Sequence, residues 1–207
     1  MADRAIREPV LFDVADFREF LETRPSEERW ELIEGLPMQS AAPRIGHQRI
    51  ASNFERHLNA ALRSRRPEWH ADREIGIEVS PDSPYRPEPG VTVIDTDIDT
   101  ERNFTDRFHL VMEVPSASDR GRILASKLRF YRDHPPNRCI VIVDQDAVAV
   151  TIHERDAADL WAVRVLRSAG DVIEFAGLGL ICTVGDLYEN THLDPRRAAP
   201  TRSSQDR

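Results

Sequence analysis

Two short, almost wholly apolar runs constrain the fold of this chain more than any other feature. They cover residues 108–114 and 139–143. Apolar runs of this length are typical of strands that are buried on both faces. The segment between them, residues 120–134, carries apolar side chains at helical spacing and ends at two prolines. The sequence therefore predicts a sheet with buried central strands and a helix packed beside them.

Other segments extend this pattern toward both ends of the chain. The expected helices begin at Asp13, run through residues 50–66 and close the domain at residues 183–189. The expected strands are residues 30–38 with a turn at Gly35, then 74–79, 91–94, 147–153 and 160–166. This order predicts an α/β (α+β) fold with a mixed central sheet flanked by helices.

Length and charge narrow the class of protein. A chain of 207 residues suits one domain, here residues 12–190, with an N-terminal extension (1–11) and a tail (191–207) expected to be disordered. The formal net charge of −8 argues against a module that coats nucleic acid with a basic face. No apolar run reaches membrane-spanning length and no signal segment is visible, so we expect a cytoplasmic protein. Two cysteines in apolar stretches predict buried thiols.

Lys127 is the only lysine in the sequence, whereas the other 27 basic residues are arginines. Arginine stays protonated at any workable pH, while lysine is a compact charge whose pKa depends on its surroundings. A lone lysine in an arginine-rich chain is therefore a candidate for a site where arginine cannot substitute. The alternative is an ordinary surface residue.

Three glutamates accompany this lysine along the chain. Glu34 follows an early apolar segment, Glu88 precedes the strand at 91–94, and Glu113 ends the apolar run at 108–114. A carboxylate at the end of an apolar strand is costly to bury unless it is paired, protonated or bound to a cation. Two such acids near a basic residue suit Mg²⁺ (or Mn²⁺), which would polarise a phosphodiester and help to ionise a water.

The order of these motifs resembles the Uma-two family, a bacterial group in the PD-(D/E)XK, restriction-endonuclease-like superfamily. The similarity runs from about Phe12 to Tyr188. It includes the segments 31–35, 47–50, 87–93, 110–118 and 141–144, and Lys127 with Tyr131 on one helix. The resemblance implies a nuclease fold, metal-dependent cleavage of phosphodiester bonds in nucleic acid, DNA foremost, and a homodimer.

Carried over residue by residue, the resemblance assigns Glu34, Glu113 and Lys127 to the catalytic positions, and Glu113 with Glu88 to the metal. Gly90 stands where the family has an aspartate that serves as a principal metal ligand. Glu88, two residues earlier in extended chain, is the nearest substitute. Pro115 also departs from the family pattern. In the simplest form of the superfamily a lysine occupies this place, so in this chain its role falls to Lys127 on the following helix.

Simpler interpretations compete at each position. Glu34 precedes a glycine and suits an exposed turn, and Glu88 lies in a proline-rich loop that favours a solvated side chain. His47 heads a helix and is interpreted as a capping or packing residue. Ser116 and Ser118 are expected to cap the helix that carries Lys127. The remaining histidines lack the close spacing of a zinc site.

The leading hypothesis is therefore a Uma-two-type endonuclease with an atypical magnesium site. A second hypothesis is a catalytically inactive protein that keeps the nuclease fold for binding or as a scaffold. A third is a subunit whose missing metal ligand comes from a partner chain.

Overall fold

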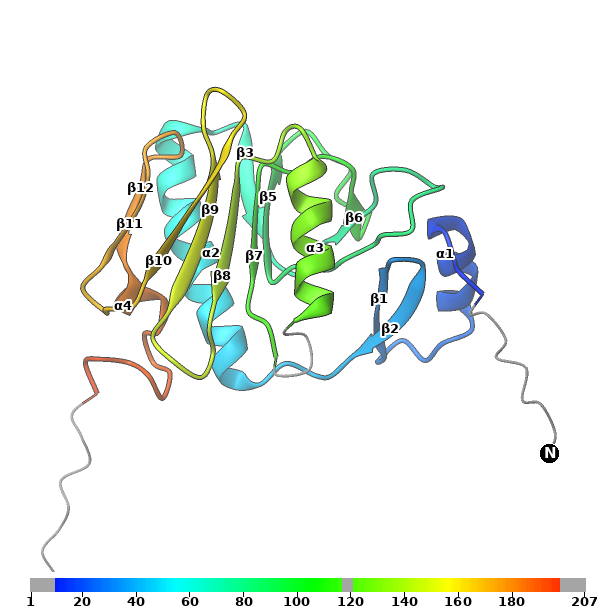
Figure 1. Ribbon diagram of the computed structural model, residues 1–207, viewed down its shortest axis with the longest axis horizontal. Helices are drawn as coiled ribbons and strands as arrows, with labels where there is room; N and C mark the ends of the chain where they lie inside the picture. Colours follow the sequence, from blue (N-terminus) through cyan, green and yellow to red (C-terminus); the bar gives the residue numbers. More distant parts are fainter. Residues whose placement is uncertain (1–9, 117–120, 198–207) are drawn as a thin grey trace, which may run out of the picture.

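The computed structural model describes residues 10–116 and 121–197, which form a central sheet with a helix on either face (Figure 1). Within these ranges the helices are α1 (Val14–Glu22), α2 (Ile45–Arg65), α3 (Arg122–Asp133) and α4 (Val184–Leu187). The expected extension at 1–11 and the end of the expected tail fall largely outside the described residues. Residues 191–197 are described, and Asn190 and Thr191 anchor them through hydrogen bonds with Asp194 and Leu193.

The central sheet has six strands in the order β10-β9-β8-β7-β5-β3. Their bounds are β3 (Trp69–Asp72), β5 (Val91–Asp95), β7 (Leu110–Glu113), β8 (Cys139–Val143), β9 (Val150–Arg155) and β10 (Trp161–Leu166). Strands β7 and β8 are parallel and α3 connects them, whereas the other neighbours in this sheet are antiparallel. The two apolar runs of the sequence are thus adjacent strands at the centre.

Both faces of the sheet are buried at its centre, as those runs predict. Leu110 and Met112 of β7 face one core, which includes the apolar side of α2. Val111 faces the opposite core, which includes Tyr131 of α3. Alternation along β7 therefore directs the next odd-numbered residue, Glu113, toward α3. No helix in 10–116 or 121–197 has the length and apolar character needed to cross a membrane.

Three two-stranded pieces surround the central sheet. The hairpin β1 (Arg29–Ile33) and β2 (Leu36–Ser40) lies beside α1 and the loop before β5 (Figure 1). Strands β4 (Gly76–Ile77) and β6 (Phe104–Thr105) form a short parallel pair, and β11 (Val172–Phe175) pairs with β12 (Leu180–Thr183). The β1–β2 hairpin carries one wall of a pocket through Arg29, Glu31 and Ser40.

Several local expectations are confirmed, and others are wrong. Asp13 caps α1, accepting a hydrogen bond from the Asp16 amide at 2.8 Å, and both cysteines are buried. The expected strand at 74–79 is reduced to β4, and the sequence does not predict β3, β6, β11 or β12. The expected serine cap of α3 is wrong for Ser116, because the residue before the helix is Gly121 and it makes no side-chain cap. Ser118 lies outside the described residues.

His134 makes the stability of this fold sensitive to acid. Its ring stacks on Phe108 at 4.1 Å, and burial lowers the pKa of His134 from 6.5 to about 4. A histidine with a lowered folded-state pKa stabilises the fold above its unfolded pKa and loses that contribution as the pH falls. We expect the free energy of unfolding to drop by about 1–2 kcal/mol on this account between about pH 6.5 and pH 4, discounted for partial exposure.

The substitution His134→Phe tests this expectation. It keeps an aromatic ring against Phe108 and removes the titrating group, so the acid-dependent loss should shrink. Urea denaturation of both proteins across this pH range measures the difference. An unchanged pH dependence in the variant would rule out His134 as its source.

Candidate functional site

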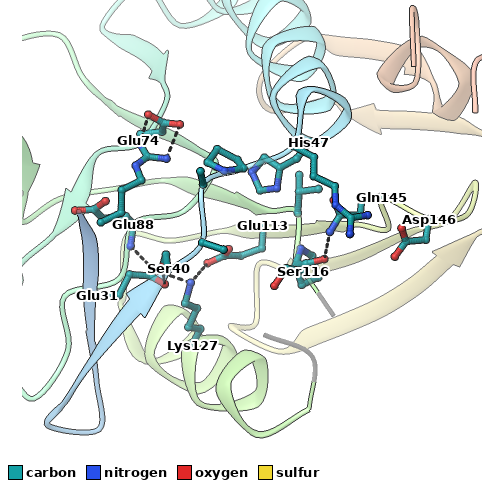
Figure 2. Close-up of a pocket in the computed structure, with 18 residues that line it drawn as sticks. Glu31, Ser40, His47, Glu74, Glu88, Glu113, Ser116, Lys127, Gln145 and Asp146 are labelled. Atoms are coloured by element: carbon teal, nitrogen blue, oxygen red, sulfur yellow. Dashed lines mark hydrogen bonds and ion pairs between the residues drawn. The ribbon is translucent and has the colours of Figure 1, made fainter. Parts of the chain in front are cut away.

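A pocket of about 550 Å³ opens between the β1–β2 hairpin, the start of α2, the end of β7 and α3 (Figure 2). Four glutamates line it, together with Lys127, His47 and Gly90: these are Glu31, Glu74, Glu88 and Glu113. The pocket therefore gathers acids from four separate parts of the chain around a single lysine.

Glu113 reaches this pocket because β7 ends there. It follows Met112, whose side chain faces α2, so strand alternation turns the Glu113 side chain toward α3. Glu113 is only 7% exposed. A carboxylate buried to this degree needs partners, and α3 supplies them.

Lys127 and Tyr131 lie one turn apart on α3 and face the same side of the helix. The Lys127 ammonium donates to Glu113 Oε1 at 3.2 Å, and the Tyr131 hydroxyl donates to the same oxygen at 2.6 Å. Lys127 is 5% exposed. Lys127 and Glu113 therefore face a common pocket.

A third group, Glu31 of β1, completes this arrangement (Figure 2). Its Oε1 lies 2.7 Å from Lys127 Nζ and also accepts from the backbone amide of Glu88 at 2.7 Å. The Ser40 hydroxyl of β2 donates to the second oxygen of Glu31 at 3.4 Å. Two carboxylates from distant segments thus converge on one ammonium group.

Burial and charge shift the pKa values of this triad. Burial raises the pKa of the Glu113 carboxyl, and the attraction of Lys127 only partly offsets that effect. Burial alone would lower the pKa of Lys127, but the carboxylates of Glu113 and Glu31 outweigh burial and raise it. Burial also raises the pKa of Tyr131. Lys127 is therefore a permanent cation near neutral pH, and Tyr131 stays a hydrogen-bond donor.

Glu88 lines the same pocket but is held from another side. Its Oε1 accepts from Arg86 at 2.7 Å, and Arg86 is itself buried against Glu78 at 2.7 Å. Burial raises the pKa of Glu88, with Arg86 acting in the opposite direction. The structure therefore brings Glu88 to the pocket while placing Glu31, not Glu88, beside Lys127 and Glu113.

Glu34 lies outside this pocket. It and Gly35 form the two-residue turn of the β1–β2 hairpin with φ values of 52° and 75°. Positive φ at both residues is the geometry of a type I′ turn. The Glu34 carboxylate accepts from Ser126 at 2.7 Å and Arg122 at 3.0 Å, and these bonds lower its pKa. Glu34 thus ties the hairpin to α3.

Gly90 borders the pocket and leaves room for a side chain. A Cβ at this position would lie 3.4 Å from the Met112 carbonyl oxygen, 3.9 Å from Ala51 Cβ and 4.0 Å from His47 Nε2. These are ordinary contact distances, and the φ of Gly90 is not in the left-handed region. The backbone therefore does not require glycine here.

The carboxylates of the pocket determine whether a divalent metal ion could bind there. Across 10–116 and 121–197, no group of three or more His, Cys, Asp or Glu side chains is placed to hold a metal ion. Glu31 and Glu113 nevertheless converge on a shared cation, Lys127. Mg²⁺ commonly takes only one or two carboxylates, with water and substrate phosphate as the other ligands. Glu31 and Glu113 thus match the number of carboxylates that such an ion commonly takes from a protein.

Sequence reasoning missed Glu31 and the role of Tyr131. Glu31 lies between Trp30 and Leu32 inside a strand, whereas Glu34 precedes a glycine in a turn. A carboxylate within an otherwise apolar strand was the available signal, the same one that indicated Glu113. The position of Tyr131, four residues after Lys127, also indicated a shared helix face.

The chain is similar to known proteins both in sequence profile and in fold. The profile of the Uma2 family, described as "Putative restriction endonuclease", matches residues 14–185. The fold is similar to the crystal structure of a protein from Anabaena variabilis titled as a putative nuclease belonging to DUF820. That match has a TM-score of 0.66 and 17% identity, and covers 87% of this chain and 98% of the other. No curated protein matches the sequence.

Proposed function

Since the chain belongs to the Uma2 family of restriction-endonuclease-type proteins, we propose that it cleaves phosphodiester bonds in nucleic acid at the pocket between α3 and the β1–β2 hairpin. The observation that carries this proposal is the buried contact of Lys127 with both Glu31 and Glu113. A buried lysine held by two acids at a pocket wall suits a site that handles negatively charged oxygens.

The surroundings of each group support a distinct role. Lys127 keeps its proton because its pKa is raised, so it is suited to neutralise charge on the phosphate or to orient the attacking water. Glu113 has a raised pKa, and Tyr131 fixes one of its oxygens. Glu31 holds Lys127 from the other side. These residues bind and orient the scissile group.

Glu113 with Glu31 would hold a divalent ion once substrate phosphate is present, and Glu88 lines the same pocket as a further oxygen donor. Such an ion, when bound, polarises the phosphodiester and lowers the pKa of a bound water. The mapping of Glu113 and Lys127 onto the PD-(D/E)XK pattern, and the dependence on Mg²⁺ or Mn²⁺, are parts of this proposal.

Nicking of supercoiled plasmid DNA with Mg²⁺ or Mn²⁺, and with EDTA, tests the proposal. We expect nicking that requires the divalent ion. We also expect Glu31→Gln to lower the rate far more than Glu34→Gln, by about tenfold or more, since Glu31 contacts Lys127 and Glu34 lies in the hairpin turn.

Nicking that persists in EDTA would contradict the metal requirement. Equal losses in the two glutamine variants would contradict the assignment of Glu31 to the site. Melting curves of both variants serve as the control, since Glu34→Gln weakens the contact with Ser126 and Arg122 and could lower stability by itself.

A second candidate is binding of nucleic acid without cleavage. It is favoured by Gly90, which brings no carboxylate to the pocket, and by the lack of a three-residue metal group within the described ranges. A wild-type protein that retards DNA in a gel shift but never nicks it would favour this candidate.

Three further parts of the proposal concern the substrate, the oligomeric state and the location of the protein. DNA as the substrate and a homodimer are supported by the similarity to the Uma-two family, and a cytoplasmic location by the lack of a membrane-spanning run in the sequence. Parallel assays on plasmid and on single-stranded RNA address the substrate, and light scattering during gel filtration addresses the oligomeric state.

A further inference from the structure

The glutamates of the pocket are already paired with basic groups of the chain itself, although two of them share one lysine. Each of the four glutamates that line the pocket contacts a basic side chain. Glu74 pairs with Arg29 at 3.0 Å, and Glu88 pairs with Arg86 at 2.7 Å. Glu31 and Glu113 share Lys127.

Lys127 occupies the place where a cation is most favourable. Its Nζ lies 2.7 Å from Glu31 and 3.2 Å from Glu113, and all three side chains are largely buried. A divalent ion entering alone would have to compete with this ammonium group for the same oxygens. Such competition weakens metal binding, because hard cations depend on the negative charge of their ligands.

Gly90 contributes no carboxylate to these ion pairs, although the backbone at this position has room for a side chain. A Cβ at Gly90 would approach its nearest neighbours no closer than 3.4 Å, and Gly90 borders the same pocket as Glu113 and Glu31. An aspartate there would bring a carboxylate that none of the four ion pairs above neutralises.

We propose that this pocket takes up a divalent cation only together with a nucleic-acid phosphate, with Lys127 serving as its resident cation until then. The phosphate restores the negative charge that Lys127 has cancelled and supplies oxygen ligands that the protein lacks. This inference rests on the proposed function and specifies how its site is regulated by substrate.

Direct binding of Mn²⁺, followed by calorimetry and by electron paramagnetic resonance, tests the proposal without any cleavage assay. For the wild-type protein alone we expect a dissociation constant weaker than about 1 mM. A short DNA duplex with hydrolysis-resistant phosphorothioate linkages should tighten binding by about tenfold or more, after subtraction of Mn²⁺ bound by the duplex itself.

Two variants at position 90 distinguish the effect of a negative charge on Mn²⁺ binding from the effect of side-chain shape. Gly90→Asp should bind Mn²⁺ without the duplex at least about tenfold more tightly than the wild type, whereas Gly90→Asn should show no gain. The inference is overturned by micromolar binding of Mn²⁺ to the wild-type protein alone, by a duplex without effect, or by equal gains in the two variants.

Lys127→Gln provides an independent test should the position 90 variants fold poorly. Removing the ammonium leaves Glu31 and Glu113 facing each other, so Mn²⁺ should raise the melting temperature of this variant and leave that of the wild type unchanged. The double variant Lys127→Gln with Glu113→Gln should lose the effect. A Lys127→Gln protein that ignores Mn²⁺ would refute the idea of a resident cation.

These outcomes are distinct from those of the nicking assay. A wild-type protein that never nicks DNA defeats the proposed function and leaves the Mn²⁺ measurements interpretable. Tight Mn²⁺ binding without a duplex defeats the further inference and leaves the nuclease proposal in place.

Discussion

The substitution Lys127→Met is expected to lower the free energy of unfolding by about 3–5 kcal/mol, because it leaves two buried carboxylates without their cation. Methionine is similar to lysine in volume and reaches as far as Cε, so most of the loss reflects the missing charge rather than an empty space. Lys127 is 5% exposed and Glu113 7% exposed, so water does little to compensate. Urea denaturation of wild type and variant measures the difference.

The same variant should respond to pH in a defined direction. Burial already raises the pKa of Glu113, and Lys127 opposes that effect, so removing Lys127 raises the pKa further. A raised folded-state pKa stabilises the fold at low pH and costs stability as the pH rises through that pKa. The destabilisation should therefore be largest at mildly alkaline pH and shrink on acidification.

Arg138→Met is the matched control, because Arg138 forms an exposed pair with Asp159 at 2.6 Å. Breaking an exposed pair costs about 0–1 kcal/mol. A Lys127→Met protein that loses no more stability than this control, or loses the same amount at every pH, would contradict the account of a buried ion triad.

Glu113→Gln should reduce the rate of plasmid nicking by at least about a hundredfold. The glutamine keeps the shape of the side chain and an oxygen that can accept from Tyr131, but it cannot carry negative charge. Lys127 retains Glu31 as a partner, so the fold should survive. Initial nicking rates at saturating Mg²⁺, with melting curves as a check on folding, measure the effect.

Glu189→Gln is a suitable control because Glu189 is a partly exposed glutamate paired with Arg56 at 2.8 Å, away from the pocket. Its nicking rate should stay within about twofold of the wild type. A Glu113→Gln protein that nicks as fast as this control would remove Glu113 from the catalytic site.

The centre of the fold could be predicted from the sequence because its signals are local. The runs that became β7 and β8 are apolar on both faces apart from His109 and Glu113, so a buried strand is the simple solution. The hairpin β11–β12 escaped detection because each strand has only four residues, and the exposed Val172 and Ile181 hide the alternation of polar and apolar side chains. The strand β4 begins only at Gly76 because Glu74 has a positive φ of 59°, which is incompatible with an extended strand.

The site was harder to predict because its members come from distant segments. Glu113 and Lys127 were found from a strand-end acid and a lone lysine, and the structure brings them together. Glu31 and Glu34 lie in one short motif, and sequence spacing does not reveal which of them forms the turn. Hairpin register decides this, since Ile33 pairs with Leu36 and leaves Glu34 in the turn.

The β1–β2 hairpin has a dynamic consequence. Glu31 belongs to this two-stranded piece, which is separate from the six-stranded sheet that carries Glu113. Small peripheral units open more readily than the body to which they are docked. A brief detachment of the hairpin would dismantle the site while the main sheet stayed intact. Amide hydrogen exchange should then reveal faster opening at Leu32 than at Val111, and substrate would slow it.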